Sequence, residues 1–247
     1  MSTSKLLPPT PLTHGSNSKT FTQPPLDGSL SIAEVFDYHA HNSPEHPIFI
    51  YEDEPGKIET IYWPQLVHAT ARVASLIRSY NVPSEAPATK VIAVLALADT
   101  ITYFTLIHGI IRAGYVPFPL SPRNSPEAIA HLLIKSRATH MLVSGDPSMQ
   151  GLSAGSLKRL AADEGSIKVE RLSVPFFADL YAPFDEKKES LESPEKVDLD
   201  ATCLMLHSSG AFFYVFSRSY SLLITSSQEV HLSQNQSLLR TAYWSNG

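Results

Sequence analysis

The stretch Val91-Ile92-Ala93-Val94-Leu95-Ala96-Leu97 decides the fold, because it is apolar at every position. A strand with one face in water alternates apolar and polar residues, whereas a strand of a parallel sheet covered on both faces reads as a continuous apolar run. Asp99 or Thr100 then offers a helix cap, and Gly114 favours the end of that helix before a second strand at 115–118. The stretch therefore predicts a β-α-β unit in a parallel sheet.

The alternation of strands and helices continues downstream. Ser125-Pro126-Glu127 joins a cap, a proline at the first helical position and an acid in the first turn, which predicts a helix over 126–137. Further strands are expected at 139–144, 167–172 and 201–206, and a further helix at 149–162. Strands alternating with helices at this spacing favour right-handed crossovers. We therefore expect an α/β fold with a parallel-rich sheet flanked by helices, containing the strands 91–97, 115–118, 139–144 and 201–206.

Upstream of this unit the pattern is different. Helices are expected at 31–41 and 64–80, and between them two strands, 48–51 and 57–62, surround an acidic turn containing Pro55-Gly56. This arrangement predicts a hairpin between two helices.

Composition excludes several functional classes. The chain has 247 residues, 43% of them hydrophobic, and a net charge of -5, which argues against a general nucleic-acid binder. The single cysteine, Cys203, excludes an intramolecular disulfide and lies in an apolar strand, where we expect it in the core. No apolar run reaches the ~18 residues of a membrane span, and the N-terminus does not resemble a secretory signal. A cytoplasmic location is the simplest expectation.

Three segments differ in composition. Residues 1–28 are rich in proline, Ser, Thr and Asn, and are expected to be a flexible leader. Residues 29–210 carry the alternating elements, with a charged, solvated connector at 183–200. Residues 211–247 are rich in Ser and Gln without a steady apolar period, so we expect an irregular tail.

The connection after the strand 201–206 is the candidate functional site. Leu204-Met205-Leu206-His207-Ser208-Ser209-Gly210 runs from an apolar strand into a turn of small residues, where backbone N–H groups and hydroxyls can cradle phosphate. A polar turn after a buried strand is the alternative interpretation. The chain then continues with the bulky Ala211-Phe212-Phe213-Tyr214-Val215-Phe216, and no Lys occurs from Ser209 to Gly247. The cationic half of a phosphate site is therefore missing.

Three segments together resemble the N-terminal portion of adenylate-forming enzymes, particularly fungal peptide-synthetase-like carboxylic acid reductases and acyl-CoA synthetases. Thr60-Ile61-Tyr62-Trp63-Pro64-Gln65-Leu66 is similar to the family's "T-Y-x-E-L" stretch. The segment from Arg112-Ala113-Gly114 to Ser125-Pro126 is similar to "A-G-x-x-x-P-x-x-P", and is the most specific of the three. Leu206-His207-Ser208-Ser209-Gly210 resembles the opening of the phosphate loop, "T-S-G-S-T-G-x-P-K". The resemblance covers about residues 29–210.

The resemblance implies ATP and Mg²⁺ as cofactors and a carboxylic acid substrate that attacks the α-phosphate and releases pyrophosphate. A carrier domain can accompany this unit in a full-length protein. The resemblance assigns His207, Ser208, Ser209 and Gly210 to cofactor binding. Because the second half of the loop, its Lys, the ribose-binding Asp and the C-terminal Lys are not found, we expect an incomplete domain that binds no cofactor productively.

Other motifs carry no catalytic or metal assignment. Gly151-Leu152-Ser153-Ala154-Gly155 matches the hydrolase G-x-S-x-G pattern, but turn residues and not a buried strand precede it, so a helix start or loop is expected. His39 and His41 are two apart on a helix and cannot chelate together; we expect both to face solvent. His108 is expected to be a hydrogen-bonded residue at the boundary of an apolar helix.

The resemblance thus implies a fragment of an ATP-dependent acid-adenylating enzyme, and the missing loop residues lead us to expect that the fragment itself is inactive. The alternative is a non-catalytic interaction module on the same fold, using apolar surface that an incomplete core leaves exposed.

Overall fold

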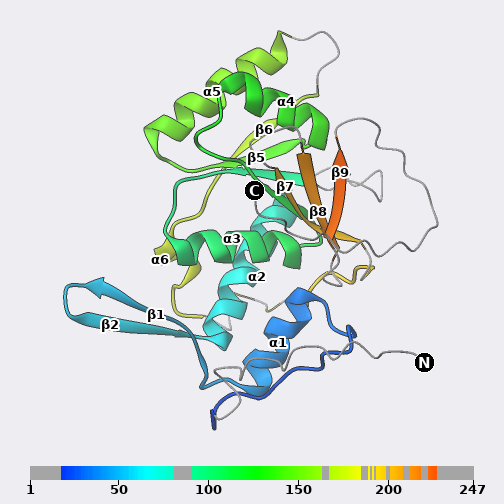
Figure 1. The fold of residues 1–247 in the computed structure, drawn as a ribbon. Helices are drawn as coiled ribbons and strands as arrows, with labels where there is room; N and C mark the ends of the chain where they lie inside the picture. The colour runs from blue at the N-terminus through cyan, green and yellow to red at the C-terminus, as the bar shows by residue number, and fades with distance from the viewer. Residues whose placement is uncertain are drawn as a thin grey trace, which may run out of the picture.

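A four-stranded parallel sheet forms the centre of the molecule (Figure 1). The computed structural model describes residues 18–80, 91–162, 167–184, 189, 191, 193–198 and 201–207, together with the backbone of 212–217 and 222–226. The strands of the central sheet are β3 (Val91–Leu95), β4 (Val116–Pro119), β5 (His140–Val143) and β6 (Glu170–Ser173), in the order β4-β3-β5-β6. The expected parallel-rich α/β fold is confirmed, with the decisive strand β3 in the interior of the sheet.

Two helices cover each face of the sheet. They are α2 (Trp63–Ser79) and α3 (Thr100–Arg112) on one face, and α4 (Pro126–Ser136) and α5 (Pro147–Ala161) on the other (Figure 1). Ile92 and Val94 of β3 belong to the core under α2 and α3, and the odd-numbered residues Val91, Ala93 and Leu95 belong to the core under α4 and α5. All five β3 residues are buried, which is why no polar alternation occurs in this strand.

Side-chain caps set the starts of these helices. Asp99 accepts the backbone N–H of Thr102 at 2.8 Å, and Ser125 accepts that of Ala128 at 3.2 Å. At the other end of α3, Gly114 has φ +85, a left-handed conformation that glycine adopts without steric cost. The helix limits predicted from these residues are confirmed to within one residue.

The N-terminal part contains α1 (Ile32–Asn42) and the antiparallel hairpin of β1 (Pro47–Glu54) and β2 (Lys57–Tyr62), which projects from the body (Figure 1). Residues 18–28 have no helix or strand, but Thr22 donates its backbone N–H to Ser43 at 2.8 Å. The Phe21 ring lies 5.1 Å from the rings of both His39 and His46. This segment therefore lies along α1.

The expectation that His39 faces solvent is wrong. His39 is 4% exposed, and its ring stacks on Trp63 with 4.4 Å between centroids. Phe21 covers it from the preceding segment. Both covering residues come from outside the helix, so the pattern of α1 alone could not reveal the burial.

The strand β7 (Thr202–His207) was expected in the parallel sheet, and this placement is wrong. β7 lies beside β4 but pairs antiparallel with β8 (Phe212–Ser217), which pairs with β9 (Leu222–Ser226) in a separate three-stranded sheet. The backbone N–H of Leu120 donates to Val94, so the alternate residues Pro117 and Pro119 are directed at the opposite edge of β4. Proline has no N–H, so this edge cannot offer β7 a full ladder.

The segment 211–247, in which sequence indicated no regular element, contains β8 and β9. Both are antiparallel and neither joins the central sheet. Ser208–Ala211 and the other residues between and after these strands lie outside the described residues.

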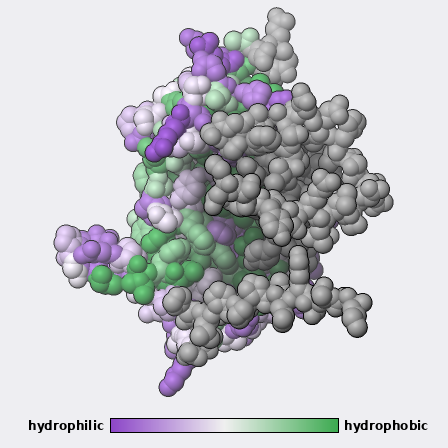
Figure 2. Space-filling model, in the orientation of Figure 1, coloured by the Kyte–Doolittle hydropathy of each residue, from purple (hydrophilic) through white to green (hydrophobic). Residues whose placement is uncertain are grey.

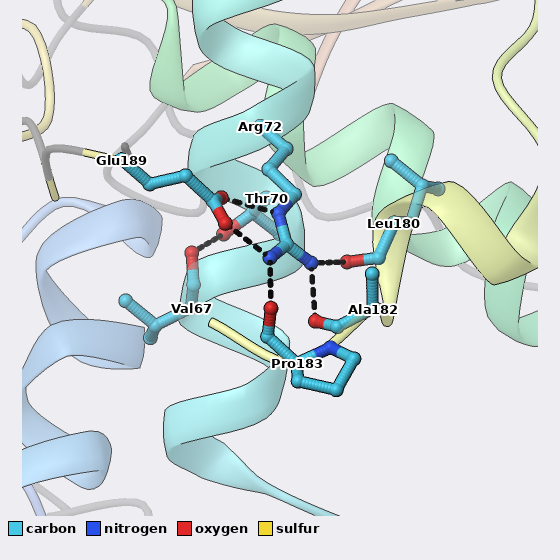
Figure 3. Close-up of polar contacts among 7 residues, drawn as sticks. All are labelled: Val67, Thr70, Arg72, Leu180, Ala182, Pro183 and Glu189. Atoms are coloured by element: carbon cyan, nitrogen blue, oxygen red, sulfur yellow. Dashed lines mark hydrogen bonds and ion pairs between the residues drawn. The ribbon is translucent and has the colours of Figure 1, made fainter. Parts of the chain in front are cut away.

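The connector to β7 is held against α2 by Arg72 (Figure 3). The guanidinium donates to both carboxylate oxygens of Glu189 at 2.5 and 2.7 Å. It also donates to the carbonyl oxygens of Leu180, Ala182 and Pro183 after the short helix α6 (Phe177–Leu180). Glu189, expected in a solvated connector, is thus half-buried in an ion pair. We call this contact the Arg72 clasp.

Candidate functional site

His207 ends β7 and is the described residue of the predicted phosphate site. Its Nε2 accepts the backbone N–H of Ser121 at 3.3 Å, and the amide nitrogen of Asn124 lies 3.5 Å from the same atom. The ring meets Phe118 edge-on, with 5.9 Å between centroids. His207 therefore docks on the turn between β4 and α4, the same segment that carries the most specific family-like sequence.

The hydrogen bond from Ser121 fixes the tautomer of His207. A backbone N–H can only donate, so Nε2 is an acceptor and the proton of a neutral imidazole lies on Nδ1. The ring is consequently a structural link between β7 and the β4–α4 turn. Sequence reasoning did not identify Ser121 or Asn124, because nothing in the linear pattern pairs them with a residue more than eighty positions away.

Ser208, Ser209 and Gly210 lie outside the described residues, so their assignment to cofactor binding stays a prediction. The next described strand, β8, begins at Phe212, and His207 of β7 pairs with Phe213 across the antiparallel ladder. β8 is also the middle strand of its sheet, so its backbone N–H groups serve β7 on one side and β9 on the other.

Few described groups at this site fit a polyphosphate. Arg123 is the one cationic side chain of the β4–α4 turn, and it is exposed. The N-terminus of α4 is capped by Ser125. Among the residues that the structure describes, no group of three His, Cys, Asp or Glu side chains could hold a metal ion. Among the described residues of the β4–α4 turn, Arg123 is therefore the side chain that can offset the charge of an anionic ligand.

The remaining motifs have structural roles. The G-x-S-x-G segment lies inside α5, where Ser153 is buried and donates to the carbonyl of Gln150 at 3.0 Å. A nucleophile elbow is thereby excluded, as expected. His108 bonds the carbonyl of Phe104 at 2.8 Å through Nδ1, which confirms its predicted hydrogen bond. Cys203 is buried.

In the described part of the chain, no helix combines the length and apolarity needed to cross a bilayer.

Comparisons with known proteins agree with the resemblance in the sequence. The chain is 40% identical over 213 residues to the adenylate-forming reductase Nps10 of Heterobasidion annosum, a match that covers 83% of this chain and 19% of that protein. It is also 35% identical over 167 residues to the adenylate-forming reductase Nps11 of Serpula lacrymans, a match that covers 66% of this chain and 14% of that protein. The chain thus spans about a fifth or less of the length of these relatives.

Solved structures share the fold. A luciferase-like enzyme from Zophobas morio matches with a TM-score of 0.58 and 18% identity, covering 80% of this chain and 45% of that one. A fatty acyl CoA synthetase from Mycobacterium tuberculosis matches with a TM-score of 0.55 and 15% identity, and the match covers 76% of this chain and 34% of that chain. The model of the AMP-binding enzyme family matches residues 36–211. With the β4–α4 turn and the family-like stretch from Leu206 to Gly210 inside that match, the chain belongs to the AMP-binding, adenylate-forming enzyme family.

Proposed function

We propose that this chain carries the first part of a domain that activates a carboxylic acid as its acyl adenylate, and that the chain itself does not catalyse that step. Enzymes of this family generally use ATP and Mg²⁺. Residues 29–210 form the partial adenylation unit in this proposal, with 1–28 as a leader and 211–247 outside the family fold. The match over 36–211 supports the central assignment.

One observation carries the proposal of inactivity: β8 begins two residues after Gly210 and is the middle strand of its sheet. The family-like loop would continue there with Ser, Thr, Gly and a Lys. In this chain those positions are Phe212 to Phe216, whose backbone donors are used by two neighbouring strands. A polyphosphate therefore meets neither the donors nor the charge of the second half of the loop.

The expected loss is large. Hydrogen bonds to charged groups contribute about 1.5–3 kcal/mol each, so losing two or more lowers affinity by orders of magnitude. The transfer step itself relies on positioning and charge neutralisation, and both are reduced here.

Purified chain tests the proposal through ATP–pyrophosphate exchange with aliphatic and aromatic carboxylic acids, and through its melting temperature with millimolar MgATP. We expect neither exchange nor an upward shift. A clear shift that Ser208→Phe and Ser209→Phe abolish, while Ser193→Phe at an exposed position of the connector preserves it, would refute the proposal. Loss of such a shift in Arg123→Ala would identify Arg123 as the compensating cation.

In a longer protein of this family, we propose a carboxylic acid substrate and an adjoining carrier domain that receives the activated acyl group. The relatives named as adenylate-forming reductases support this extension. The cytoplasm is the proposed compartment, on the ground of the single buried cysteine.

A further inference from the structure

The helix α3 carries apolar side chains on two faces. Its inner face, including Leu106 and Ile110, is fully buried under α2 and the sheet. A second stripe follows the helical spacing i, i+3, i+4, i+7, i+8: the half-buried apolar residues Tyr103, Phe104 and Ile107 lie between the exposed Thr100 and the half-buried His108. Three large apolar side chains that stay partly exposed on one helix face can contact a further apolar group. The outer stripe is therefore a candidate contact surface.

The surface formed by this outer stripe contains a shallow depression. Together with Ala98, just after β3, its residues line an open depression of about 380 Å³. In the orientation of Figure 1, the surface over α3 next to the hairpin is predominantly hydrophobic (Figure 2). A depression of this volume accepts one or two large apolar side chains.

The β1–β2 hairpin borders this depression. The Phe49 ring of β1 meets Phe104 of α3 edge-on, with 5.3 Å between centroids. Beyond that contact the hairpin is acidic: Glu52, Asp53, Glu54 and Glu59 surround a single base, Lys57. Its tip is hydrophilic in Figure 2.

The acidic residues follow closely on the Phe49 contact, because Tyr51, two residues further along β1, pairs with Glu59 across the hairpin. Burial raises the pKa of the Tyr51 phenol, and the carboxylates of Asp53, Glu59 and Asp99 raise it further. Asp99 is the N-cap of α3, directly after Ala98. Lys57 is already bound to Asp53 at 3.2 Å and to Glu59 at 3.0 Å. An apolar depression with an acidic border results.

We propose that this acidic-bordered depression docks a cationic amphipathic segment of a partner protein. One apolar side chain of the segment fills the depression on α3, and its Lys or Arg side chains lie against the hairpin carboxylates. Charge complementarity selects this occupant. A second copy would bring an equally acidic hairpin to the contact, and an anionic bilayer would be repelled by it.

The probe is a fluorescein-labelled helical peptide of Leu and Lys, titrated with the full chain and followed by fluorescence anisotropy. We expect saturable binding that weakens as salt is added, and no binding of the matching Leu and Glu peptide. The doubly neutralised variant Asp53→Asn, Glu59→Gln keeps side-chain shape, and its affinity should fall about tenfold. Ala98→Trp, which fills the depression, should lower the affinity at least as much.

Glu170→Gln is the matched control, since that carboxylate is exposed on β6, the edge strand farthest from β4 in the sheet order. It should leave the affinity unchanged. Equal binding of both peptides, or affinity unchanged in both site variants, would overturn the proposal. So would binding to phosphatidylcholine vesicles or concentration-dependent dimerisation in place of peptide binding, because each assigns the surface to another occupant.

Discussion

At the scale of single residues, the histidines show how tertiary contacts change the chemistry of a side chain. Burial, followed by the charge of His46, lowers the pKa of His39 below the usual histidine range. Burial also lowers the pKa of His108, whose ring stacks on Phe104 with 3.9 Å between centroids. Both rings are therefore favoured in the neutral form in the folded chain.

Acid should destabilise the protein through these two rings. Below about pH 6.5 the unfolded chain binds protons that the folded chain does not, so the free energy of unfolding decreases as the pH falls toward the lowered folded pKa values. Urea unfolding at a series of pH values between 7.5 and 5 measures this decrease. At about pH 7 and above, the free energy of unfolding should no longer depend on these two rings. His39→Phe keeps an aromatic ring and should flatten the dependence.

His41→Phe is the control for this measurement, because His41 is exposed on the same helix. It should flatten the dependence less than His39→Phe. Equal slopes for the native chain and His39→Phe would contradict the interpretation.

At the scale of elements, α2 and α3 pack closely because Gly109 has no side chain. A Cβ at this position would lie 2.5 Å from Cγ1 of Val73 and 3.0 Å from the carbonyl oxygen of Thr70. The contact involves backbone and the stiff β-branched Val73, so neither can easily yield. The spacing of the two helices thus depends on this glycine.

Gly109→Ala should therefore destabilise the chain by about 1–3 kcal/mol, as overpacking does. Gly151→Ala in α5 is the matched control, since a Cβ there meets nothing within 4 Å. It should be neutral or stabilise by up to about 1 kcal/mol. Chemical denaturation of the two variants side by side tests the difference, and a harmless Gly109→Ala would show that α2 and α3 can separate.

The Arg72 clasp should hold the connector that leads to β7. Arg72→Ala removes the hydrogen bonds that Arg72 donates to Glu189 and to three carbonyl groups, and we expect a loss of about 1.5–3 kcal/mol and faster tryptic cleavage after Lys196. Arg72→Lys should restore little, because an ammonium cannot reproduce the planar fork of donors. Arg159→Ala, which removes an exposed pair with Glu127, should change stability by less than about 0.5 kcal/mol. If Arg72→Ala were cleaved by trypsin at the same rate as the native chain, Arg72 would not hold the connector in place.

The sequence predicted most elements, and its failures have identifiable causes. β3 could be recognised because a strand covered on both faces needs an apolar residue at every position. The residues of β7 alone could not predict which sheet the strand joins, because pairing also depends on the backbone N–H and C=O groups that the neighbouring strand has available at its edge. Pro117 and Pro119 did carry that information, since they remove N–H groups from one edge of β4. The docking of His207 on Ser121 depends on that same tertiary placement, and no local pattern encodes it.

At the scale of the whole molecule, the central sheet joins two cores into one folding unit. Phe118 of β4 is fully buried in the core under α4 and α5, and β4 is hydrogen-bonded to β3, which contributes to both cores. A defect at Phe118 should therefore lower the stability of the entire sheet.

Phe118→Ala should cost about 3–5 kcal/mol, the usual loss for removing a buried phenyl group. The matched control is Phe176→Ala, because Phe176 is 73% exposed. It should change stability by no more than about 0.5 kcal/mol. Circular dichroism and tryptophan fluorescence should give coincident urea transitions for both variants. Separate transitions would show that the two cores unfold independently.

The interior position of β3 also has a consequence during synthesis on the ribosome. β3 leaves the exit tunnel before either neighbour, and its partner in β5 is far along the chain, since Ile92 pairs with His140. At about 5–20 residues per second, the nascent strand waits roughly 2–10 s for that partner. During this interval five consecutive apolar residues lack their sheet, so Val91–Leu95 is the segment of this chain that a chaperone would be expected to shield first.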